Sequence, residues 1–194
     1  PESHITCGNG GADLLYRLAF GLHPKKVLLP APAFVEYEEA LSAAGAQMEY
    51  YLMRDDFVIK EDILEQITEE TDFVVICNPN NPTGILTEKE LILRVLERAK
   101  ETNTFVMADE CFLEICQNES EYTVKPFIEK YENLIILKSF TKLYAIPGVR
   151  LGYILAGSED VIAKVNRTGQ AWSVSHIAQC AGVAALSDNV YKER

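Results

Sequence analysis

The stretch that decides the fold is residues 73–84, which read FVVICNPNNPTG. Its first part, Phe73–Cys77, is a short and unbroken apolar run. Such runs are typical of strands that are covered on both faces, as in parallel sheets. Prolines, asparagines and a glycine follow at once, and these residues favour turns. We therefore predict a buried strand that ends in a loop of unusual composition at residues 78–84.

Similar short apolar runs alternate with longer helical patterns along the chain. We predict further strands at residues 27–29, 48–52, 105–108, 134–137 and 153–156. Helices are expected at residues 12–22, 35–44, 62–67, 88–100 and 175–186, the fourth opened by a capping box from Thr87 to Glu90. This βαβ alternation predicts an α/β fold, a three-layer α/β/α sandwich around a mostly parallel sheet. No linker divides the sequence, so we expect one domain over residues 1–194.

Composition excludes several classes of partner. The 194 residues carry 29 acidic and 18 basic side chains, a formal charge of −11, whereas a nucleic-acid backbone needs a basic face. No apolar run approaches the ~20 residues of a membrane span. The five cysteines form no C-x-x-C pair, as in reduced cytoplasmic proteins, and the three histidines lack the spacing of a metal site. We expect a cytoplasmic protein with no metal, no nucleic-acid partner and no membrane partner.

The chain begins at Pro1 rather than Met, and its first residues have no charged region followed by an apolar one. We therefore expect no secretion signal in this sequence. Pro1 also suggests that residues upstream of it have been removed.

Polar residues follow the expected strands at the carboxyl ends, which face one crevice in an open α/β sheet. Asp109 comes after residues 105–108, where a buried carboxylate needs a cation such as a protonated pyridine nitrogen. Lys142, after residues 134–137, has the amine that forms an imine with a carbonyl cofactor. The hydroxyls of Ser139 and Thr141 are placed to hold a phosphate beside it. The planar guanidinium of Arg150 suits a bidentate phosphate contact.

A glycine-rich turn at residues 8–12, GNGGA, leads directly into the first expected helix. Gly11 and Ala12 therefore offer backbone N–H groups and a positive helix end to an anion. The turn is no dinucleotide fingerprint, because G-x-G-x-x-G read from Gly8 would need glycine where Asp13 stands. These residues favour an anion site and argue against a nucleotide-binding fold.

Each of these features has an ordinary structural explanation when taken alone. The 78–84 loop could be a pair of turns, the aspartate a cap, the lysine a solvated loop residue and the glycines a tight turn. Together they are better explained by one site. Phe34 is as consistent with core packing as with stacking on a flat ligand. Cys77 and Cys111 flank the site, and without a histidine beside them we interpret both as small buried residues rather than catalytic thiols.

From Gly8 to its end the sequence resembles the class I and II aminotransferases, which are fold-type-I pyridoxal-phosphate enzymes. The most specific parts are residues 78–84, Asp109-Glu110, Ser139-x-x-Lys142 and residues 147–153, PGVRLGY. The resemblance implies that residues 1–194 are the large cofactor-binding domain of such an enzyme. It implies that Lys142 holds pyridoxal 5'-phosphate as a Schiff base and shuttles protons.

The resemblance also implies roles for the residues around this lysine. Asp109 would pair with the pyridine nitrogen and Asn81 would hydrogen-bond the phenolic oxygen of the cofactor. The implied remaining contacts are Gly11, Ala12, Ser139 and Arg150 at the phosphate, with Phe34 stacked on the ring. Phe112 departs from the pattern, because most of the aminotransferases have a tyrosine there that donates a second hydrogen bond to the phenolic oxygen.

Within the family the sequence looks similar to the branch of histidinol-phosphate aminotransferase and threonine-phosphate decarboxylase, and residues 139–148 lean toward the decarboxylase. We expect an aminotransferase that acts on an amino acid or a phosphorylated amine, and a homodimer when full length. The alternatives are a threonine-phosphate decarboxylase of cobalamin biosynthesis and a non-catalytic binding domain. The resemblance implies that the N-terminal segment and the small C-terminal domain, with the arginine that grips the substrate carboxylate, lie outside residues 1–194.

Overall fold

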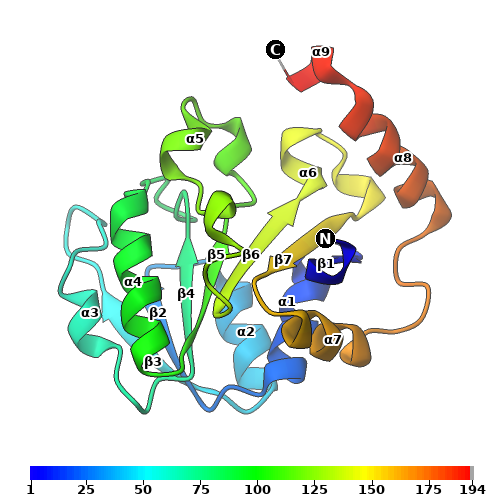
Figure 1. The fold of residues 1–194 in the computed structure, drawn as a ribbon. Helices are drawn as coiled ribbons and strands as arrows, with labels where there is room; N and C mark the ends of the chain where they lie inside the picture. Colours follow the sequence, from blue (N-terminus) through cyan, green and yellow to red (C-terminus); the bar gives the residue numbers. More distant parts are fainter. Residues whose placement is uncertain (193–194) are drawn as a thin grey trace.

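The structure is a computed structural model that describes residues 1–192, and its centre is a mixed β-sheet (Figure 1). Within these residues the sheet has seven strands in the order β1-β7-β6-β5-β4-β2-β3. The strands are β1 (Ile5–Gly8), β2 (Lys26–Ala31), β3 (Gln47–Leu52), β4 (Phe73–Cys77), β5 (Phe105–Asp109), β6 (Leu134–Ser139) and β7 (Gly152–Ala156). Strands β2 to β6 pair in parallel, and β7 is antiparallel to both β1 and β6.

Helices cover both faces of this sheet. Apolar side chains of α1 (Gly11–Leu22), α2 (Val35–Ala43) and α7 (Glu159–Thr168) pack into one core cluster. Those of α3 (Ile63–Gln66) and α4 (Lys89–Glu101) pack into a second cluster on the other face. Figure 1 shows α4 on one side of the strands and α1, α2 and α7 on the other. The predicted α/β/α sandwich with a mostly parallel sheet is confirmed.

The remaining helices are short or lie at the end of the described chain. They are α5 (Glu119–Tyr122), α6 (Phe140–Leu143), α8 (His176–Ser187) and α9 (Asn189–Lys192), with 3₁₀ turns η1 (Glu2–His4), η2 (Leu113–Ile115), η3 (Lys125–Phe127) and η4 (Pro147–Val149). Among residues 1–192, no helix combines the length and the apolarity that crossing a bilayer requires.

Local sequence explains why these elements form. Every residue of β4 and β6 is buried, in keeping with continuous apolar runs that are covered on both faces. Helix α4 buries Leu91, Ile92, Val95, Leu96 and Ala99, which recur at the helical period, and its charged residues face solvent. The parallel strands β4, β5 and β6 end at one edge of the sheet in fixed register, and Cys77 pairs with Asp109 across β4 and β5.

Two expectations need correction. The helix expected at residues 62–67 is the single turn α3. The capping box from Thr87 to Glu90 is wrong, because α4 has Glu88 as its N-cap and no side-chain cap. Instead the Asn78 side chain accepts from the Thr87 N–H at 2.9 Å and donates to the Thr87 carbonyl at 3.0 Å. The sequence analysis also missed the edge strand β1 and helix α7.

Candidate functional site

The last residues of β4, β5 and β6 are Cys77, Asp109 and Ser139, and all three line one cavity of about 170 Å³. Every residue that the sequence predicted for the site lines the same cavity. These are Gly11, Ala12, Phe34, Asn81, Asp109, Ser139, Thr141, Lys142 and Arg150. The fold thus brings together segments that are far apart in the sequence, while the roles of these residues stay predictions.

Asp109 is held at the floor of the cavity by two neutral donors. Its Oδ2 accepts a hydrogen bond of 2.6 Å from the Tyr37 hydroxyl, and its Oδ1 accepts from the Cys111 N–H at 2.9 Å. Burial, and then the neighbouring Asp109 carboxylate, raise the pKa of Tyr37 well above its usual value, so the phenol keeps its proton and donates. Both donors orient the carboxylate without neutralising it, which leaves its charge available to a cationic ligand group.

Tyr37 is the functional candidate that the sequence analysis missed. It is 1% exposed in the first turn of α2 and its ring meets Phe34 edge to face, with the centroids 5.6 Å apart. A signal was present, because Phe34 and Tyr37 are three residues apart and so lie on one side of a helix start. Nothing local in the sequence indicated that the hydroxyl would reach Asp109.

The loop at residues 78–84 contains three asparagines whose side chains lie in different surroundings. The side chain of Asn78 is bonded to the Thr87 backbone, and that of Asn80 donates to the Pro32 carbonyl at 3.1 Å. These two amides fix the path of the loop after β4. Asn81 is the asparagine of the three that lines the cavity.

Hydrogen-bond donors gather at the other end of the cavity, where α1 begins. Gly10 has φ +87°, and a Cβ atom there would lie 2.6 Å from Nη2 of Arg150, so the guanidinium lies against the glycine turn. The hydroxyl oxygens of Ser139 and Thr141 are 2.7 Å apart on the same wall. The first N–H groups of a helix have no partner within the helix. Together these groups form a site suited to an anion with several oxygens.

Two lysines lie near the carboxyl end of β6, Lys138 within the strand and Lys142 on α6, and their surroundings differ. Lys138 is fully buried, with Nζ at 3.3 Å from Glu110, 3.5 Å from Glu114 and 3.6 Å from Glu119. Burial acts to lower the pKa of Lys138, but the three carboxylates outweigh it and raise the pKa. The Lys138 amine therefore stays protonated, and a protonated amine cannot attack a carbonyl.

Lys142 is exposed to the cavity on α6, and its Nζ lies 4.7 Å from the centroid of the Phe112 ring. The face of an aromatic ring attracts a cation at this distance. Lys142 and Arg150 both lie in the connection between β6 and β7, whose base is closed by the pairing of Ser139 with Gly152. The amine and the guanidinium thus come from one segment.

The two cysteines at the site are poor nucleophiles. Burial, with a contribution from Asp109, raises the pKa of Cys77 to about 12. Burial also raises the pKa of Cys111 well above its usual value. Since the thiolate is the reactive form, neither thiol is activated at neutral pH.

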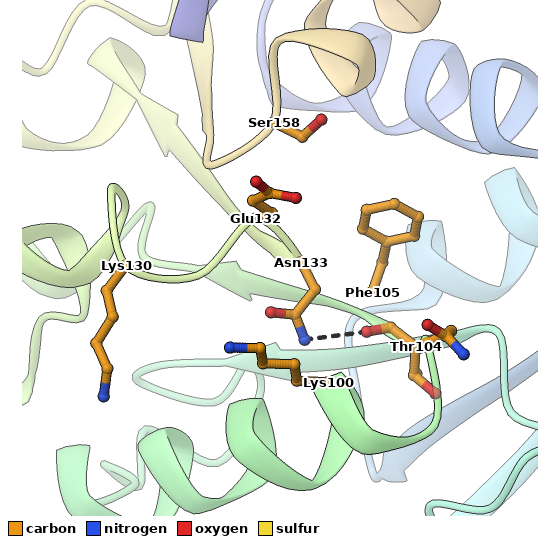
Figure 2. Close-up of a pocket in the computed structure, with 8 residues that line it drawn as sticks. Lys100, Thr104, Phe105, Lys130, Glu132, Asn133 and Ser158 are labelled. Carbon is orange, nitrogen blue, oxygen red and sulfur yellow. Dashed lines mark hydrogen bonds between the residues drawn. The ribbon is translucent and has the colours of Figure 1, made fainter.

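A more open cavity of about 570 Å³ lies at the opposite edge of the sheet, where β5 and β6 begin (Figure 2). Its polar groups hold chain segments together: the Asn133 amide donates to the carbonyls of Thr104 and Leu96. The Lys130 ammonium on its rim is 3.1 Å from Glu97. This cavity contains none of the predicted site residues, so the chemistry is concentrated at the carboxyl edge.

Comparison with known proteins gives one family. The family model described as aminotransferase class I and II matches residues 1–193. The threonine-phosphate decarboxylase of Salmonella typhimurium is 34% identical over 195 residues, which cover all of this chain and 53% of that protein. The histidinol-phosphate aminotransferase of Ruminiclostridium cellulolyticum is 36% identical over 99% of this chain and 52% of that protein.

Solved structures agree with the sequence comparison. The histidinol-phosphate aminotransferase from Clostridium acetobutylicum superposes with a TM-score of 0.91 at 29% identity, over 98% of this chain and 56% of that one. The chain therefore spans about half the length of the relatives that it matches.

Proposed function

Because the chain belongs to the class I and II aminotransferase family, we propose that residues 1–194 form the large, cofactor-binding domain of a pyridoxal-phosphate-dependent transaminase. The observation that carries the proposal is the meeting of Lys142 and Asp109 in one cavity, an amine beside a buried carboxylate. The proposed substrate is an amino acid or a phosphorylated amine.

The residues of the cavity fit pyridoxal 5'-phosphate group by group. The Asp109 carboxylate, with neutral donors only, suits a protonated pyridine nitrogen, and the Asn81 amide suits the phenolic oxygen. The start of α1 with the Ser139 and Thr141 hydroxyls and the Arg150 guanidinium suits the phosphate. Phe34 supplies an aromatic wall.

When bound, the cofactor would withdraw electrons from the bond that is broken at the substrate Cα. Asp109 would keep the pyridine nitrogen protonated, because its negative charge favours the cationic form. The Lys142 amine would hold the cofactor through its aldehyde carbon, with water as the leaving group, and Lys142 Nζ would carry the proton at the substrate Cα. Thr141 and Ser139 would help to hold the phosphate in place.

A second candidate reaction is decarboxylation of threonine phosphate. Phe112 lines the cavity where the family pattern has tyrosine, and one relative is named a threonine-phosphate decarboxylase. Transamination remains the lead, because the residues that would orient the substrate carboxylate are not among those lining this cavity. A non-catalytic binding domain is the third candidate, and the combination of Lys142, Asp109, Asn81 and Arg150 in one place argues against it.

We also propose that the full-length protein is a cytoplasmic homodimer. The described structure has five free cysteines, as is common in reducing compartments. Homodimers with isologous contacts are the commonest oligomers of soluble enzymes.

The test of cofactor attachment is borohydride reduction of full-length protein after addition of pyridoxal phosphate, followed by peptide mapping. The label is expected on Lys142 and should disappear in Lys142→Ala. Lys125→Ala, which changes an exposed lysine elsewhere, is the matched control. Label on Lys138, or no label in a protein that is folded, contradicts the assignment.

The test of reaction type uses two substrates. Formation of a new amino acid from a keto acid with histidinol phosphate or an aromatic donor supports transamination. Release of carbon dioxide from threonine phosphate supports the second candidate. A protein that binds the cofactor but performs neither conversion favours the non-catalytic alternative.

A further inference from the structure

An ion pair between a buried arginine and a partly exposed aspartate lies beside the glycine turn of the proposed phosphate site. Arg17, one turn after Asp13 on α1, is 6% exposed. Its Nε is 3.1 Å from Oδ1 of Asp13 and its Nη2 is 2.8 Å from Oδ2. The pair is thus joined by one charge-assisted hydrogen bond, from Nε, and by a close Nη2–Oδ2 ion-pair contact without hydrogen-bond geometry.

The Asp13 carboxylate also shapes the turn itself. Its Oδ2 accepts the backbone N–H of Asn9 at 2.8 Å. A Cβ atom at Gly8 would lie 2.7 Å from the same oxygen, so the turn is packed closely against the carboxylate. Asp13 therefore fixes the backbone of the turn immediately before Gly11 and Ala12.

Arg17 is in turn fixed by the end of α7. A Cβ atom at Gly169 would lie 2.4 Å from Nη1 of Arg17, and the Thr168 hydroxyl donates to the Arg17 carbonyl at 2.8 Å. The guanidinium thus occupies the space that a side chain at position 169 would fill. It cannot leave Asp13 without disturbing the contact between α1 and α7.

The negative charge of Asp13 has two opposite effects at the start of α1, and Arg17 offsets the unfavourable one. A carboxylate in the first turn of a helix stabilises that helix, but it also repels a phosphate bound at the same helix end. Water screens this repulsion only in part, because the Asp13 side chain is 27% exposed and its partner Arg17 is buried. A cation paired with Asp13 removes most of it and leaves the hydrogen bond to Asn9 intact.

We propose that Asp13 and Arg17 are positioning residues for the cofactor phosphate: Asp13 shapes the glycine turn, and Arg17 neutralises Asp13 so that the phosphate can bind. This inference rests on the proposed function, and neither residue lines the cavity itself. It predicts that the sign of the charge at position 17 controls the affinity for a phosphorylated ligand.

The first test compares two substitutions of Arg17 in full-length protein, with the dissociation constant for pyridoxal phosphate measured from visible absorption. Arg17→Met keeps most of the apolar stem but exposes the site to the charge of Asp13, and is expected to weaken binding about tenfold. Arg17→Lys keeps the charge and is expected to stay within about threefold of the wild type.

The second test is rescue. Adding Asp13→Asn to Arg17→Met removes the uncompensated charge, while the asparagine oxygen can still accept from the Asn9 N–H. The double variant is expected to return to within about threefold of wild-type affinity. If Arg17→Met does not fold, Asp13→Asn alone decides, because removal of the charge must leave phosphate binding undiminished. Weakening of more than about threefold in that variant overturns the proposal.

Pyridoxal, which lacks the phosphate, separates this role from general damage. All of the variants are expected to bind pyridoxal as the wild type does. Equal weakening for pyridoxal and pyridoxal phosphate, or failure of the rescue, overturns the proposal. Wild-type protein that does not bind pyridoxal phosphate overturns the proposed function and this inference with it. Normal wild-type binding with an unaffected Arg17→Met overturns this inference alone.

Discussion

Replacement of Tyr37 by phenylalanine removes a single buried oxygen and keeps the ring. The Tyr37 hydroxyl lies 2.6 Å from Oδ2 of Asp109, and the two residues are 1% and 7% exposed. A hydrogen bond to a charged group contributes about 1.5–3 kcal/mol, and a buried acceptor left without its donor loses that amount. For a domain of this size, each kcal/mol shifts the unfolding midpoint by about 2–4 °C. We expect Tyr37→Phe to lower the midpoint by about 3–12 °C.

Urea unfolding and calorimetry of the protein without added cofactor measure this change. Tyr16→Phe is the control, because the Tyr16 ring packs against the same core cluster at the surface of α1, and its effect should stay within about 0.5 kcal/mol. If Tyr37→Phe also stays within about 0.5 kcal/mol, the hydrogen bond to Asp109 is not what holds the carboxylate, and our account of the site floor is refuted.

Tyr37→Phe should also change how the free energy of unfolding depends on pH under alkaline conditions. The pKa of Tyr37 is raised in the folded protein by burial and by Asp109, so its contribution to stability is complete below the unfolded value of about 10. That contribution is lost as pH rises toward the folded pKa. The free energy of unfolding should therefore fall less steeply above about pH 10 in Tyr37→Phe than in the wild type.

Three further predictions concern the site and its surroundings. Phe112→Tyr adds a hydroxyl that favours the ionised phenolic oxygen, so the pH midpoint of the visible-absorption change in cofactor-loaded protein should fall; an unchanged midpoint would place Phe112 away from the cofactor. Lys138→Met leaves three carboxylates around an apolar side chain without a positive partner. It should lower the free energy of unfolding by about 3–5 kcal/mol in urea titrations, and a decrease of less than about 1 kcal/mol would contradict a stabilising role of the ion pairs. At about pH 8, exposed Cys180 should react with iodoacetamide well before Cys77, whose pKa is raised to about 12, and equal rates by mass spectrometry would disprove the burial argument.

The residues at strand ends could be predicted from the sequence because their chemistry is unusual for their position. A lysine and an aspartate that follow apolar runs are expected to meet at one edge of a parallel sheet, and Lys142 and Asp109 do line one cavity. Arg150, which comes just before β7, lines the same cavity. The contacts that hold them there were not predictable. Tyr37 and Asp109 are 72 residues apart in the chain, and their hydrogen bond exists only in the folded sheet.

The errors in the predicted secondary structure also come from contacts between segments that the local sequence does not reveal. Strand β1 has four residues and exists through its pairing with β7, near the other end of the sequence. The residues within and around a strand do not indicate which distant strand it will pair with. The capping box failed for a related reason, because Asn78 from the preceding loop bonds to Thr87. In both cases a distant or tertiary partner outweighed a local preference.

The connection between β6 and β7 has a kinetic consequence. Residues 140–151 leave and re-enter the sheet at neighbouring positions, since Ser139 pairs with Gly152 and the Phe140 N–H donates to the Leu151 carbonyl at 3.1 Å. Such a loop can open locally while the strands that anchor it remain paired. Lys142 and Arg150 would then leave the cavity in the same opening event, so a ligand that engages either end of the loop slows amide hydrogen exchange throughout it.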